Sequence, residues 1–63
     1  MKLHSVVRLK VDVPEEQLKS GAIGTVVAVF DRPELAYEVE CAYERGATIA
    51  ELALRPDQIE EVQ

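Results

Sequence analysis

The sequence predicts a small all-β domain, a five-stranded barrel with one short 3₁₀ turn before its last strand. Short segments rich in valine and other strand formers alternate apolar with polar residues, as half-buried strands do. Proline, glycine and aspartate turn signals separate these segments. The chain has 63 residues, enough for one domain over residues 1–63 and too few for a two-sheet sandwich, so a barrel is favoured.

The first predicted strand covers residues 6–11. Val7 and Leu9 share the parity that faces the core, and Arg8 and Lys10 share the parity that faces solvent. A mostly polar loop with one helical turn is expected to follow, because the apolar alternation stops there.

The second predicted strand covers residues 24–30 and is apolar on both parities, which suits a strongly curved barrel strand. Val27 and Val29 are expected to face the core. Unless a bulge changes the parity, the opposite face carries Val26, Ala28 and Phe30.

The third and fourth predicted strands cover residues 36–42 and 48–54, joined by a tight turn at Arg45-Gly46. The residues expected to face the core are Tyr37, Val39, Cys41, Ala50, Leu52 and Leu54. The residues expected to face solvent are Glu38, Glu40 and Glu51. Residues 56–58 then form the 3₁₀ turn and residues 59–62 the last strand.

The composition points to a small, globular and acidic protein. Twelve Asp and Glu residues against seven Lys and Arg give a formal net charge of −5, and 48% of the residues are hydrophobic. No apolar run is long enough to span a bilayer, and no secretory signal is evident. These features predict a cytoplasmic protein. A core this small leaves association with a partner or with copies of itself open.

The sequence offers no equipment for catalysis, metal binding or cofactor binding. One cysteine and one histidine, Cys41 and His4, provide neither a metal-ligand cluster nor a disulfide. Cys41 has the inward parity, which favours a buried packing residue over a nucleophile. Gly21 and Gly24 precede a strand instead of a helix, so a phosphate-binding loop is disfavoured. A non-enzymatic protein is therefore expected.

Several motifs resemble the small bacterial domain-of-unknown-function family 4926. They cover nearly the whole chain, and they are residues 6–9, 14–16, 21–27, 37–40 and 52–59. The resemblance implies an SH3-like barrel and supplies no catalytic residue. Residues 21–26 also resemble the KOW-type motif of ribosome-associated barrels, which is mainly a solution for a turn that enters a curved strand.

Two functions fit these features. The first is a protein-interaction module that masks a basic partner, in the manner of an antitoxin or immunity protein, through Glu38, Glu40 and Glu51. The alternative is an RNA- or ribosome-associated barrel that uses a patch formed by Arg8, Lys10, Lys19 and Arg32. The acidic charge balance ranks nucleic acid second, because cationic side chains supply most non-specific affinity for phosphate.

Overall fold

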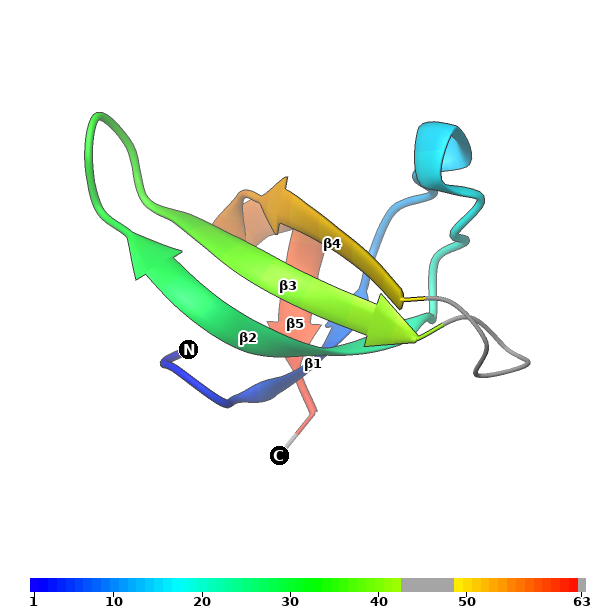
Figure 1. The fold of residues 1–63 in the computed structure, drawn as a ribbon, viewed down its shortest axis with the longest axis horizontal. Coiled ribbons are helices and arrows are strands. Elements are labelled where there is room, and N and C mark those ends of the chain that lie inside the picture. Colours follow the sequence, from blue (N-terminus) through cyan, green and yellow to red (C-terminus); the bar gives the residue numbers. More distant parts are fainter. Residues whose placement is uncertain (43–48, 63) are drawn as a thin grey trace.

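The computed structural model describes residues 1–42 and 49–62 and has five strands in one antiparallel sheet (Figure 1). The strands are β1 (Val6–Leu9), β2 (Ile23–Phe30), β3 (Ala36–Ala42), β4 (Ile49–Leu54) and β5 (Ile59–Glu61). Two 3₁₀ helices, η1 (Pro14–Glu16) and η2 (Pro56–Gln58), precede β2 and β5. The predicted all-β class, with five strands and a 3₁₀ turn before the last, is confirmed. The predicted turn at Arg45-Gly46 and the predicted strand start at Thr48 lie outside the described residues.

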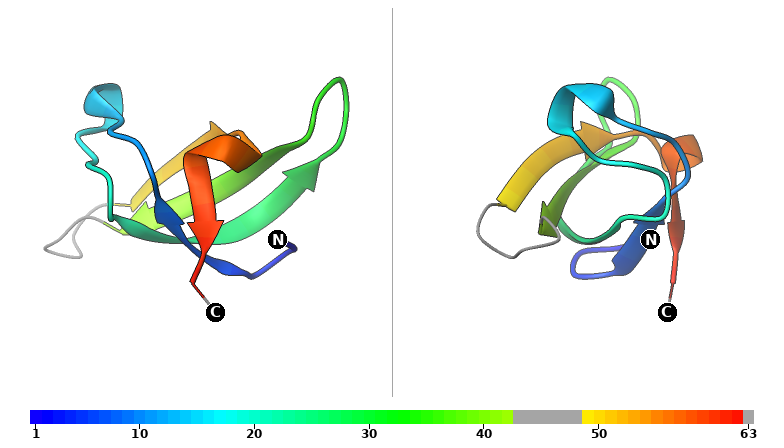
Figure 2. Two further views of the ribbon diagram at one scale, coloured as in Figure 1. Left: turned by 180° about the vertical axis from the view of Figure 1, so that it is seen from behind. Right: turned by 90° about the vertical axis from the view of Figure 1, so that its right-hand side faces the viewer.

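The sheet curls around a single core. Its hydrogen-bonded order is β4-β3-β2-β1-β5, and no ladder joins β4 to β5 in the described part of the chain. The β1–β5 pair crosses one face of the β2–β3–β4 meander, as the views from the front and from behind show (Figures 1 and 2). The core fills the space between these two parts of the sheet. The molecule is elongated, with extents of 32 × 21 × 17 Å.

One cross-strand row forms the centre of the core. The ladders place Val7, Gly24, Cys41 and Ala50 side by side on four successive strands. All four are buried, and Cys41 has no exposed surface. The other buried hydrophobic residues are Leu9, Leu18, Val26, Tyr37, Val39, Leu54 and Ile59. The small members of the row let the strands pack closely where the sheet curves.

The predicted faces of β1, β3 and β4 are confirmed. In β1 the buried residues are Val7 and Leu9, although the strand ends at Leu9 instead of continuing to residue 11. In β3 and β4 the residues predicted inward are buried, apart from Leu52, which is half-buried and packs against the core. Period-two alternation therefore located the buried faces of three strands.

The predicted faces of β2 are wrong up to a β-bulge and right in parity beyond it. Val26 was expected to face outward but is completely buried, while Val27 is only half-buried. The register shifts between Val26 and Ala28, which leaves Val27 without a partner in β3. Beyond the bulge, Val29 lies opposite the buried Tyr37, so it has the inward parity, yet it is 44% exposed at the end of the sheet.

Gly24 is required by the close approach of β2 to β3. A β-carbon at this position would lie 2.6 Å from Sγ of Cys41 and 2.7 Å from Cγ1 of Val39. Side-chain atoms do not approach this closely, so only glycine fits. Gly21 is different, because open space surrounds it and its φ of +96° favours glycine through backbone conformation alone.

We predict that Gly24→Ala lowers the free energy of unfolding by roughly 1–3 kcal/mol, because the added methyl group overpacks the row between β2 and β3. Urea denaturation measures the change. Adding Cys41→Ala removes the sulfur nearest to the new methyl group, so the double variant should be less destabilised than the sum of the two single variants. An unchanged unfolding midpoint for Gly24→Ala would contradict the close packing.

The buried Cys41 thiol couples stability to alkaline pH. Burial disfavours the charged thiolate and raises the pKa of Cys41 above its ordinary value of 9.0. The folded protein therefore holds the thiol proton more tightly than the unfolded chain does. This stabilisation is complete below the unfolded-state pKa and is lost as the pH rises through the higher folded-state pKa.

We predict that the stability advantage of the wild-type protein over Cys41→Ala shrinks above about pH 9, by up to about 1.4 kcal/mol per pH unit. Chemical denaturation of both proteins at about pH 7.5 and about pH 10 measures this difference. The comparison isolates the thiol, because the two proteins differ only at residue 41. Parallel pH profiles for the two proteins would show that the thiol is solvated in the folded state.

Candidate functional site

The three glutamates singled out in the sequence lie on one face of the β3–β4 hairpin, which we call the acidic face (Glu38, Glu40 and Glu51). Glu40 and Glu51 are directly opposite each other in the ladder, and both are exposed. Glu38 follows on the same side of β3, where it is half-buried opposite Ala53. No hydrogen bond or ion pair connects these three carboxylates to another residue in the described ranges 1–42 and 49–62.

Two arginines near the sheet are paired with other carboxylates. Arg8 donates a hydrogen bond of 2.8 Å to Glu60 across the β1–β5 ladder, and both side chains are about half exposed. Arg55 contacts Asp57 at 3.3 Å. Exposed pairs of this kind contribute little stability, but they leave the acidic face without neutralisation from Arg8 or Arg55.

The structure does not gather the predicted nucleic-acid patch into one surface. Arg8 is engaged with Glu60, while Lys10 and Lys19 are exposed near the loop between β1 and β2. Arg32 belongs to the β2–β3 turn, at the opposite end of the long axis from η1 (Figures 1 and 2). Arg32 is thus separated from the other three cations along the molecule, and the four do not form one phosphate-binding surface (Figures 1 and 2).

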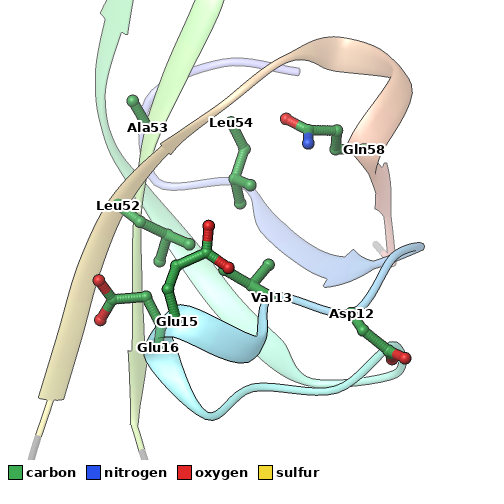
Figure 3. A pocket seen from close by; sticks show the side chains of 8 residues that line it. All are labelled: Asp12, Val13, Glu15, Glu16, Leu52, Ala53, Leu54 and Gln58. Atoms are coloured by element: carbon green, nitrogen blue, oxygen red, sulfur yellow. The ribbon is translucent and has the colours of Figure 1, made fainter.

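A second surface feature, which we call the seam groove, lies between the η1 loop and β4 (Figure 3). It is an open depression of about 310 Å³. Its lining consists of four apolar residues, three carboxylates and one amide, and these are Val13, Leu52, Ala53, Leu54, Asp12, Glu15, Glu16 and Gln58. No lysine or arginine is among them.

Local hydrogen bonds hold the η1 side of the seam groove in place. The Val13 and Leu18 backbones form an isolated antiparallel bridge, which closes the loop around η1. The Asp12 carboxylate accepts a 2.9 Å hydrogen bond from the Ser20 amide at the base of the loop. Leu18 is buried and anchors the loop to the core, so the acidic rim is carried by an ordered segment.

The other side of the groove is held by β4 and η2. The side chains of Leu52 and Leu54 point toward Val13, whereas Ala53 points to the opposite face of the strand (Figure 3). At η2, the Arg55 amide donates to Oε1 of Gln58 at 2.8 Å, and the Gln58 amide donates to the Arg55 carbonyl at 3.0 Å. This reciprocal capping fixes the position of Gln58 beside the groove.

The groove is a feature that sequence reasoning did not identify. The loop residues Asp12, Glu15 and Glu16 are close together in the sequence, but only the curl of the sheet brings them opposite Leu52 and Leu54. The available signal was a run of carboxylates around Val13, an apolar residue in an otherwise polar loop. That signal indicates that the loop packs against an apolar surface, but it does not identify the strand that provides this surface.

The described residues provide neither a reactive thiol nor a cluster of metal ligands. Cys41 is completely buried with a raised pKa, which is the opposite of what a reactive thiolate needs. No group of three or more metal-ligating side chains occurs in residues 1–42 and 49–62. Within the same ranges, no helix has the length and apolar character needed to cross a bilayer.

Comparison with known proteins identifies a family and gives no activity. No curated protein and no solved structure matches the chain. The family model described as "Domain of unknown function (DUF4926)" matches residues 3–61, which is nearly the whole chain and includes both the acidic face and the seam groove. The resemblance seen in the sequence motifs is thereby confirmed, and the protein belongs to the DUF4926 family.

Proposed function

We propose that this protein is a non-enzymatic interaction module whose acidic face binds a basic surface of a partner protein. The single observation that carries the proposal is the direct pairing of Glu40 with Glu51 on an exposed sheet surface. Like charges directly opposite each other on neighbouring strands destabilise a sheet. A partner that supplies lysine or arginine between them would turn this repulsion into attraction.

The overall charge favours the same class of partner. A net charge of −5 on 63 residues gives a negative field that accelerates encounter with basic proteins and repels nucleic acid. A small acidic barrel that covers a cationic site would act as an antitoxin or immunity protein does, by masking. A cytoplasmic location in a bacterial cell is part of this proposal, and it rests on the composition and the family resemblance.

We predict that Glu51→Lys raises the free energy of unfolding by roughly 0.2–1 kcal/mol, because it replaces a like-charge cross-strand pair with an opposite-charge pair. Urea denaturation at low ionic strength measures the gain, which should shrink as salt is added. Glu34→Lys makes the same change of charge in the exposed β2–β3 turn and serves as the control. Equal effects of the two substitutions would mean that net charge, and not the Glu40–Glu51 pair, sets the stability.

We predict that Glu40→Gln/Glu51→Gln removes partner capture while the fold is retained. The wild-type protein and this variant are used as baits in cell extract, and captured proteins are quantified by mass spectrometry. The matched control, Asp31→Asn/Glu34→Gln, removes two charges from the β2–β3 turn instead of the acidic face. A basic protein should be enriched by the wild type and the control and lost with the face variant. Equal capture by both variants would refute the proposal.

A further inference from the structure

β4 is an edge strand whose outer side has no backbone partner in the described part of the chain. Its ladder is formed with β3 alone, and none of the backbone hydrogen bonds described in turns and loops reaches it. In an antiparallel ladder, every second residue of an edge strand directs its N–H and C=O groups away from its neighbour. β4 therefore presents backbone donors and acceptors to an incoming strand.

The sequence of β4 lacks the usual protection of an edge strand. Natural edges are commonly blunted by lysine, by proline or by a bulge. The segment Ile49–Leu54 contains neither residue type, and its register with β3 is regular over all six pairs. The one charged side chain it carries is Glu51, which belongs to the acidic face. An edge kept regular in this way is competent to pair with another chain.

The seam groove lies directly beside this edge and offers an apolar floor. Leu52 and Leu54 line it from β4, and Val13 faces them from the η1 loop (Figure 3). Glu15 is exposed on the rim above this floor. A strand placed along β4 would therefore have apolar surface beneath its inward face. Glu15 would lie beside that face, and Glu51 would lie on the outward face.

Alternation along β4 specifies the chemistry of such a strand. Side chains of paired residues on adjacent strands lie on the same face, so inward residues of the added strand would meet Leu52 and Leu54. Its outward residues would lie beside Glu51, which is itself directly opposite Glu40 on β3. The complementary segment therefore alternates apolar residues with lysine or arginine.

We propose that the β4 edge binds an extended segment of the partner by strand addition, and that this segment alternates apolar and basic side chains. The inference rests on the proposed function and names its mode of recognition. Main-chain hydrogen bonds to β4 would supply affinity, and the seam groove and Glu51 would select the alternate side chains. A second copy of this chain is disfavoured as the occupant, because its own β4 would bring another Glu51 and a net charge of −5 to an acidic edge.

The test uses synthetic peptides of about eight residues, a typical strand length. The first alternates lysine with valine, and the second contains the same residues in two blocks. Two further versions of the alternating peptide are N-methylated on every lysine or on every valine, so that one of them loses the donors that face β4. Each is titrated into the isotope-labelled full chain at low salt, and binding is followed by backbone amide NMR shifts.

We expect the alternating peptide to shift the amides of β4 and of residues 12–18. One N-methylated version should bind about tenfold more weakly while the other binds normally. The block peptide should also bind about tenfold more weakly, although its charge is the same. Glu15→Gln should weaken binding of the alternating peptide several-fold, and the control Glu34→Gln should not change it.

Four results would overturn strand addition. All four peptides could bind equally, with Glu40→Gln/Glu51→Gln weakening each of them, which would leave the proposed acidic-face function standing. The shifts could map to the exposed end of β2 or to β5, the other edge of the sheet. All peptides could fail to bind while capture from extract still depended on the acidic face. Finally, the peptides could have no effect because β4 pairs with β4 of a second copy in a stable dimer.

Discussion

The structure depends on the close packing of one cross-strand row, formed by Val7, Gly24, Cys41 and Ala50. Because Gly24 has no side chain, Cys41 and Val39 can lie against the backbone of β2 at distances that any β-carbon would prohibit. The row lets the sheet curl, so that β1 and β5 pack over the β2–β3–β4 meander. The curl also brings the η1 loop opposite β4. The core and the seam groove thus follow from the same constraint.

The distribution of charge follows from this arrangement. Inward positions are occupied by the apolar half of each alternating strand, and outward positions of the β3–β4 hairpin receive Glu38, Glu40 and Glu51. Arg8 and Arg55, which lie close to the sheet, form ion pairs elsewhere, with Glu60 and Asp57. An exposed and unneutralised carboxylate pair is therefore a property of the fold and its sequence together, and it lies beside an open strand edge.

Clean alternation made β3 predictable, because Glu38 and Glu40 leave one choice of buried face. The same logic placed Glu40 and Glu51 on a shared surface. Alternation alone could not assign the faces of β2, since both of its parities are apolar and the bulge at Val27 changes the parity along the strand. Before the bulge, backbone hydrogen bonds also tie Val26 to the chain just before β1. The Val26 amide donates to the Ser5 carbonyl, and the His4 amide donates to the Val26 carbonyl. The seam groove could not be predicted either, because its two sides are far apart in sequence and meet only through the curl.

The bulge at Val27 divides β2 into halves with different numbers of neighbours. The first half pairs with β1 through Thr25 and with β3, whereas the second half, from Ala28 to Phe30, pairs with β3 alone. Fewer neighbours mean a smaller free-energy cost for local opening. The tip of the β2–β3 hairpin should therefore exchange its amide hydrogens through sub-global fluctuations, while amides near Gly24 exchange only when the whole domain unfolds.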